Sequence, residues 1–226
     1  MKKSNALETI IKSTVNKTES RPALKSVALT KDGSLYATDS HVAIHVSDYH
    51  KLPIKETVTF DPIAYQFTKN VRYPEIAQLF GGTSNEPHNE LEIKLADLKT
   101  ILPMLKAYSK ASSTELVKLE TTDNDGMLTV SIESNKSDNV ISKQAISAKV
   151  IGGNLFQASY SYFTPTHLYQ LLNPLIYRNS NNDSITYYQQ HNELCPALFK
   201  INQRTDSSCE HEKLQFEYLI APVKKL

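Results

Sequence analysis

The strongest constraint on the fold is an order of helical and strand patterns that occurs twice along the chain. In the first copy, apolar residues recur at helical intervals over residues 4–17. Residues 23–29 and 34–46 are rich in β-branched and aromatic residues and flank a Lys-Asp-Gly turn sequence at 31–33. This pattern predicts one amphipathic helix followed by two antiparallel strands.

The second copy begins near residue 91. One helical face carries an apolar stripe of Leu95, Leu98, Ile101, Leu102 and Leu105. Strand-like segments at 116–119 and 127–132 then flank an Asn-Asp-Gly turn sequence at 124–126. Because the two copies share this order but little residue identity, the repeat is one of architecture.

The rest of the chain continues the alternation of helices and strands. Thr164 and Pro165 are typical of the N-cap and first residue of a helix. Further strands are predicted at 57–60, 160–163, 184–189, 197–201 and 214–220. Residues 81–87, which begin with two glycines, are the best linker. We therefore expect an α+β protein with two domains, residues 1–82 and 88–226, each with helices packed on an antiparallel sheet.

Composition and motifs exclude several classes of protein. With 226 residues, 40% hydrophobic and 22% charged, the chain is typical of a globular protein, and its net charge of +1 gives no global affinity for nucleic acid. Its two cysteines form no CxxC motif. Neither a signal peptide nor an apolar run of about 20 residues that could span a membrane is present. We expect a cytoplasmic protein.

No catalytic or metal site is predicted. Asp39 and His41 are two residues apart, but no nucleophile motif accompanies them. His191, Cys209 and His211 match no zinc-ligand spacing. Since the chain also has no glycine-rich phosphate loop, we expect neither an enzyme nor a cofactor.

Four motifs, in the same order, resemble the second and third domains of the bacterial DNA polymerase III β subunit, the sliding clamp. They are Arg-Pro-Ala-Leu-Lys-Ser-Val at 21–27 with Ala-Thr-Asp-Ser-His at 37–41, Arg-Tyr-Pro-Glu at 72–75, Phe-Gln-Ala-Ser-Tyr at 156–160, and the ending 219–226. In the 37–41 turn and just after it, Ser40 and Val42 replace the glycine and the arginine of that family. The resemblance implies two clamp-like domains, of which the first is incomplete because few residues lie between Phe60 and Arg72.

The resemblance also implies an apolar cleft between the two domains that holds QLxLF-like peptides of a DNA polymerase or other partners. Carried over by motif, the cleft comprises Leu24, Thr38, Ser40, His41, Val42, Leu219, Ala221, Pro222 and Val223. The alternative is that the apolar members are ordinary core residues. Pro222 favours the cleft, because a proline in a strand lies at an edge or a bulge.

A sliding clamp further implies helices whose lysines attract the phosphates of duplex DNA without reading its sequence. The DNA-binding residues would be Lys2, Lys3, Lys12, Lys99, Lys106 and Lys110, with Lys17 and Lys94 beside them. The alternative is a solvated helix face, since Glu8 and Asp97 interrupt both sets.

The expected function is that of a replication processivity factor that binds partner peptides and encircles DNA as a homo-oligomer. Two alternatives stay open: a non-encircling adaptor or decoy of phage or mobile-element origin, and a clamp-fold protein with an unrelated binding role. Residues 77–80, Ala-Gln-Leu-Phe, look like part of a clamp-binding peptide themselves. The competing explanation for this segment is that Leu79 and Phe80 anchor the interdomain linker in the interior.

Overall fold

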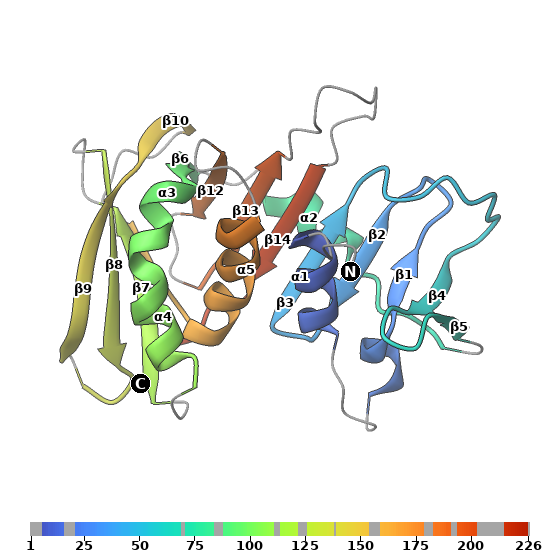
Figure 1. Ribbon diagram of the computed structural model, residues 1–226, viewed down its shortest axis with the longest axis horizontal. Coiled ribbons are helices and arrows are strands. Elements are labelled where there is room, and N and C mark those ends of the chain that lie inside the picture. The colour runs from blue at the N-terminus through green and yellow to red at the C-terminus, as the bar shows by residue number, and fades with distance from the viewer. Residues whose placement is uncertain are drawn as a thin grey trace.

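The computed structural model places most of the chain in helices and antiparallel strands (Figure 1). It describes residues 6–15, 21–68, 71–83, 88–110, 114–121, 126–137, 139–153, 159–178, 183–190, 194–202 and 215–225. The α+β class predicted from the sequence is confirmed.

The helices and strands have the following bounds. The helices are α1 (Ala6–Thr14), the 3₁₀ turn η1 (Pro22–Lys25), α2 (Ala77–Thr83), α3 (Leu95–Leu98), η2 (Lys99–Ile101), α4 (Leu102–Tyr108) and α5 (Pro165–Arg178). The strands before residue 100 are β1 (Val27–Leu29), β2 (Leu35–Thr38), β3 (Val42–Val46), β4 (Val58–Asp61), β5 (Gln66–Thr68) and β6 (His88–Lys94). The later strands are β7 (Glu115–Thr121), β8 (Met127–Ser134), β9 (Val140–Ser147), β10 (Lys149–Gly153), β11 (Ser159–Phe163), β12 (Ser184–Gln190), β13 (Ala197–Asn202) and β14 (Gln215–Ile220).

One sheet extends through both predicted domains. Its strand order is β10-β6-β12-β13-β14-β3-β2-β1-β4-β5, and a second sheet has the order β11-β7-β8-β9. The two parts of the chain join where β14 pairs antiparallel with β3, in a register that sets Ile220 opposite Val42 and Phe216 opposite Val46. We call this pairing the seam. The sheet is therefore continuous across the boundary expected at residues 82–88, and the division into two domains stays a prediction.

The longer helices lie in a row on one side of the strands (Figure 1). α1 packs against α5, and α5 packs against α4, so one hydrophobic core lies beneath all three. In α1, Leu7, Ile10 and Ile11 are buried at the helical spacing seen in the sequence. α5 begins at Pro165, directly after Thr164, as predicted.

Local sequence patterns predicted most of the helices and strands, but the structure corrects three of the predictions. Residues 34–46 are two strands, β2 and β3, because Asp39 to His41 form a turn between them. Gly81 and Gly82 belong to helix α2 rather than to a linker. Strands β5, β6, β9 and β10 were not predicted.

A small second core covers the side of the seam opposite the row of α1, α5 and α4. It consists of Ala43, Ile76, Phe80, Leu198 and Leu219. Phe80 is 8% exposed, so it anchors α2 as the linker hypothesis expected, whereas Leu79 is 44% exposed and does not. The Ala-Gln-Leu-Phe segment thus packs on its own chain through its phenylalanine. None of the described helices is long and apolar enough to cross a membrane.

Candidate peptide and metal site at the seam

The turn between β2 and β3 is held by hydrogen bonds from its own side chains. Asp39 Oδ1 accepts hydrogen bonds from the backbone N–H groups of His41 (2.8 Å) and Val42 (2.9 Å). Thr38 Oγ1 donates to the carbonyl oxygen of Val42 at 2.6 Å and accepts from the N–H of Ser40 at 3.1 Å. Polar side chains that satisfy their own backbone in this way fix a tight turn, so the direction in which His41 leaves the sheet is set locally.

Ser40 occupies the left-handed backbone region, with φ of +80°. An L-residue with a side chain is disfavoured there, which explains why a glycine suits this position in the family that the sequence resembles. In this chain the Ser40 hydroxyl accepts a hydrogen bond from Arg21 Nη1 at 2.9 Å. That bond links the turn to η1, which carries Leu24.

Residues 221–223 lie next to this turn. Ala221 donates its N–H to the carbonyl oxygen of His41 at 2.8 Å, and Val223 donates to the carbonyl oxygen of Tyr162 on β11 at 2.9 Å. The 221–223 segment therefore leaves the seam and reaches the second sheet. Ala221, Pro222 and Val223 are all partly exposed.

His167, in the first turn of α5, faces the same turn. Its ring stacks on that of His41, with centroids 5.6 Å apart, and its Nε2 lies 3.8 Å from Asp39 Oδ2. Burial lowers the pKa of His167; the Asp39 carboxylate opposes this and His41 adds to it, so the net pKa lies below the usual value of 6.5. His167 was not predicted as a site residue, because no local pattern indicates which residue of a helix contacts a turn far away in the chain.

The structure gathers most of the predicted cleft residues but not on one surface. Thr38, Ser40, His41, Ala221, Pro222 and Val223 lie around the turn. Val42 is 2% exposed and belongs to the core on the helix side, whereas Leu219 is 4% exposed and belongs to the second core on the opposite side. Successive side chains of a strand point to opposite faces of the sheet. Because Val42 and Leu219 lie on opposite faces, they can support the site but cannot line one cleft together.

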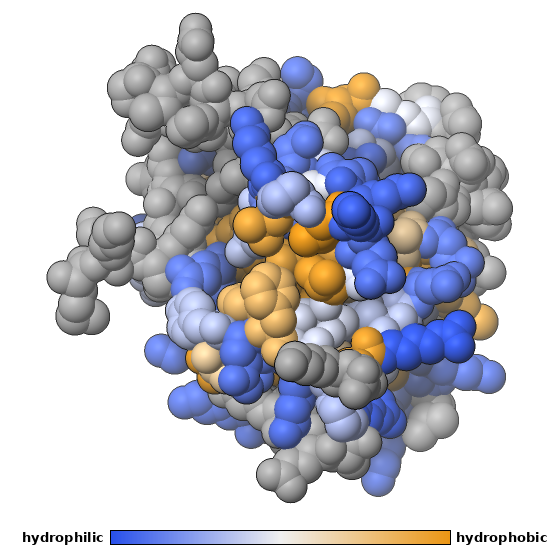
Figure 2. Space-filling model, turned by 90° about the vertical axis from the view of Figure 1, so that its right-hand side faces the viewer, coloured by the Kyte–Doolittle hydropathy of each residue, from blue (hydrophilic) through white to orange (hydrophobic). Residues whose placement is uncertain are grey.

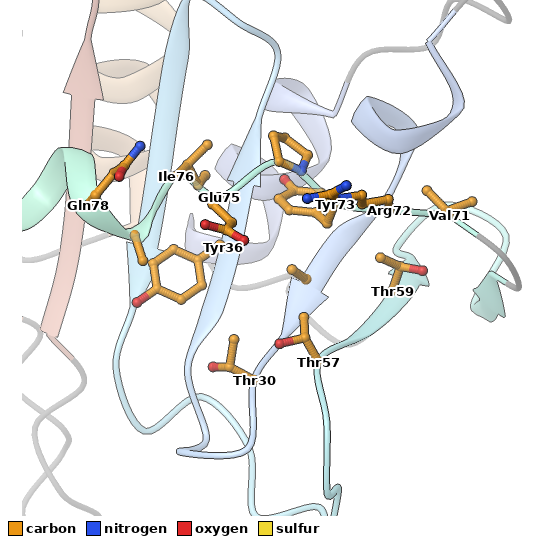
Figure 3. Close-up of a pocket in the computed structure, with 13 residues that line it drawn as sticks. Thr30, Tyr36, Thr57, Thr59, Val71, Arg72, Tyr73, Glu75, Ile76 and Gln78 are labelled. Carbon is orange, nitrogen blue, oxygen red and sulfur yellow. The ribbon is translucent and has the colours of Figure 1, made fainter.

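Two grooves are lined by the 72–78 segment. One, of about 570 Å³, lies between this segment and strands β1, β2 and β4, and Figure 3 shows Tyr36, Thr59 and Arg72 around it. The other, of about 680 Å³, is bounded by η1 and includes Leu24. The Arg-Tyr-Pro-Glu motif at 72–75, noted in the sequence only for its resemblance, therefore forms a wall of both grooves.

The predicted DNA-binding lysines differ in their surroundings. Lys12 on α1 pairs with Glu8 at 2.7 Å and lies over the ring of Tyr65, 4.7 Å from its centroid. Lys99, Lys106 and Lys110, at α4 and its two ends, are exposed. Lys2, Lys3 and Lys17 lie outside the described residues, as do His191, Cys209 and His211, and so does the 156–158 part of the Phe-Gln-Ala-Ser-Tyr motif.

Comparison of the whole chain with known proteins gives a match only at the level of structure. No protein-family model and no curated protein matches the sequence. A DNA polymerase sliding clamp from Bacillus subtilis matches with a TM-score of 0.65 and 19% identity over 98% of this chain and 62% of the clamp chain. The DNA polymerase III subunit beta from Pseudomonas aeruginosa matches with a TM-score of 0.69 and 12% identity over 97% of this chain and 63% of that one.

These identities show the fold alone. In both clamps the matched region is less than two thirds of the protein, as the two-domain resemblance in the sequence implied. The chain has the fold of the bacterial DNA polymerase III β sliding clamp and spans about 62% of its length.

Proposed function

We propose that this protein is a sliding-clamp homologue, not an enzyme, that binds short peptides of DNA polymerase or other replication proteins at the seam. The observation that carries the proposal is the meeting of the β2–β3 turn, the 221–223 segment and the first turn of α5. Loops and ends held by a rigid sheet are common binding elements, because their side chains are fixed but still accessible.

The chemistry of this junction suits a peptide with apolar anchors. Ala221, Pro222 and Val223 offer partly exposed apolar surface, while Ser40 and His41 are exposed and can form hydrogen bonds. Leu24, Thr38, Val42 and Leu219 are each less than 9% exposed, so they would support the site rather than contact the peptide. Sliding clamps from Bartonella birtlesii and Pseudomonas aeruginosa with the same fold have been solved bound to griselimycin.

Peptide binding can be tested by fluorescence anisotropy with a labelled QLxLF-type peptide. Val223→Asp should weaken binding at least about ten-fold, because it places a charge against the apolar anchors. Val150→Asp is the matched control, since Val150 is 45% exposed on β10 at the far edge of the sheet. Circular dichroism would confirm that both variants fold. Equal affinity of the two variants, or no binding by the unaltered protein, would contradict the proposal.

We also propose that the row of helices faces duplex DNA. Lys99, Lys106 and Lys110 are exposed on or beside this row, and their charges can attract phosphates without reading bases. Encirclement requires several copies or a partner chain. The β4–β5 end is a suitable interface, because apolar residues gather there with polar ones around them (Figure 2), and Ile63, Tyr65 and Phe67 are 48%, 65% and 58% exposed.

Encirclement is tested by retention on DNA circles. The protein, with its loader if one is required, should stay on a closed circle and leave when the circle is cut, because topological binding needs no tight contact. Light scattering over a concentration series should show a closed oligomer, and Ile63→Glu should dissociate it. A monomer at every concentration that still binds the peptide would instead identify an adaptor or decoy.

A further inference from the structure

Three metal-ligating side chains converge beside the seam. Asp39 and His41 come from the β2–β3 turn, and His167 comes from the first turn of α5. One donor atom from each residue lies within 4.8 Å of the other two. The sequence predicted no metal site, because His167 is far from the other two residues along the chain and no ligand spacing relates them.

The β2–β3 turn and α5 already position two of the three donor residues, Asp39 and His167. Asp39 Oδ1 is used by the backbone of the turn, which leaves Oδ2 directed toward His167 Nε2 at 3.8 Å. The side chains of His167 and Asp39 are only 14% and 18% exposed. His41 is exposed, so its ring has room to rotate toward the other two.

We propose that Asp39, His41 and His167 form a binding site for a zinc ion. Two imidazole nitrogens and one carboxylate oxygen are a common zinc ligand set, and three protein ligands leave a fourth tetrahedral position open. Zinc–ligand bonds of about 2.0 to 2.2 Å place ligand atoms roughly 3.3 Å apart, so the three donors must approach one another slightly. Rotation of the exposed His41 ring supplies most of that movement.

The charges of the three donors suit a divalent ion. Zinc binds neutral imidazole nitrogens, and the Asp39 carboxylate compensates one of the two positive charges of the ion.

A zinc ion here would link the β2–β3 turn to α5 across the seam. Such a link should stabilise the folded protein, because the ion binds the folded chain and the three donors are dispersed when it unfolds. The ion would also share His41 with the proposed peptide site. The zinc site itself does not depend on the proposed function, because its test needs neither peptide nor DNA.

The experiment titrates the full-length, metal-free protein with Zn²⁺ in a calorimeter and with Co²⁺ in a visible spectrometer. We expect one ion per chain and the intense visible absorption of tetrahedral Co²⁺. His41→Gln and His167→Gln should each weaken binding at least about ten-fold and remove that absorption. A rise in Tm on adding Zn²⁺ should be lost in the same two variants.

The matched control is the double variant Cys209→Ser, His211→Gln, which removes two other zinc donors that lie two residues apart in the sequence. It should bind one ion with unchanged affinity. If this control loses the ion while the His41 and His167 variants keep it, or if the protein binds no Zn²⁺ at micromolar concentration, the inference is wrong. Circular dichroism of each variant separates a lost site from a lost fold.

Discussion

Lys225 Nζ lies 2.9 Å from Glu133 Oε2, and this contact fastens the end of the sequence to the second sheet. Tyr162 on β11 donates a hydrogen bond to the same carboxylate oxygen at 3.0 Å, and Lys225 Nζ lies 5.3 Å from the centre of its ring. The Glu133 side chain is 8% exposed. The 221–223 segment is therefore held between the seam and this ion pair, which fixes its position within the proposed peptide site.

Lys225→Met should destabilise the protein by about 2 kcal/mol at pH 7, because it leaves a buried carboxylate without its cation. Lys224→Met is the matched control, since Lys224 is exposed, and it should change the free energy of unfolding by less than about 0.5 kcal/mol. Urea denaturation measures both. Equal losses of unfolding free energy in the two variants would show that the ion pair between Lys225 and Glu133 makes no specific contribution to stability.

The same pair predicts a dependence of stability on pH. Burial by itself would raise the pKa of Glu133, but the hydrogen bonds from Lys225 and Tyr162 and the charges of Lys225 and Lys118 outweigh it, so the pKa is lowered below 4.5. The stabilisation is thus fully present above pH 4.5 and is lost as the pH falls through the lower, folded-state pKa. Glu133→Gln should remove this part of the acid dependence, measured as the free energy of unfolding between pH 7 and pH 3.

Replacement of Ser40 by glycine should preserve or raise the stability of the protein, and replacement by a β-branched residue should lower it. Its φ of +80° disfavours any side chain, so Ser40→Val should cost at least about 1 kcal/mol, whereas Ser40→Gly should be neutral or stabilising by up to about 1 kcal/mol. Ser40→Ala separates the backbone effect from loss of the hydrogen bond with Arg21. Thermal denaturation of the three variants tests the order Gly, Ala, Val, and a reversed order would contradict it.

Phe80→Ala should destabilise the protein by about 3 kcal/mol, because the ring fills the second core against Ala43 and Leu219. Leu79→Ala removes a neighbouring side chain that is 44% exposed and should cost less than about 0.5 kcal/mol. Chemical denaturation measures the difference. If both changes are equally mild, α2 is not anchored on the seam as described.

Charge reversal should affect DNA retention to different extents at different lysines of the helix row. Lys99→Glu with Lys106→Glu should shorten retention on circular DNA and reduce its dependence on salt, because fewer phosphate charges are neutralised. Lys12→Glu should have a smaller effect, since Lys12 is already paired with Glu8. Lys136→Glu with Lys149→Glu, both on exposed positions of the strands and turns, is the control. Retention unchanged by the first pair would contradict the DNA-facing assignment.

Local sequence patterns were sufficient for the elements whose pattern is determined by near neighbours. The leucine stripe from Leu95 to Leu105 and the proline at Pro165 predicted α3, α4 and α5, because helical spacing and capping act within a few residues. The turn sequences before Gly33 and Gly126 predicted hairpins for the same reason; both glycines have positive φ. The motifs also led to the clamp fold, which the structural comparison bears out.

Strands that are stabilised by pairing with distant partners could not be predicted from local sequence patterns. β9 begins with two exposed apolar residues, Val140 and Ile141, and β10 contains two glycines, so neither shows the alternation of a half-buried strand. Their pairing with β8 and β6 is what makes them strands. Likewise, Gly81 and Gly82 look like a linker, but Ile76 and Phe80 pack on the seam and hold the segment in a helix.

The sequence by itself determined the order of helices and hairpins and the resemblance to a sliding clamp, because each depends on residues close together in the chain. The tertiary structure alone decided that Val42 and Leu219 face opposite sides of one sheet and that His167 meets His41. Such contacts depend on the register in which β14 pairs with β3, and a register between distant strands is set by packing of the whole sheet rather than by any local pattern.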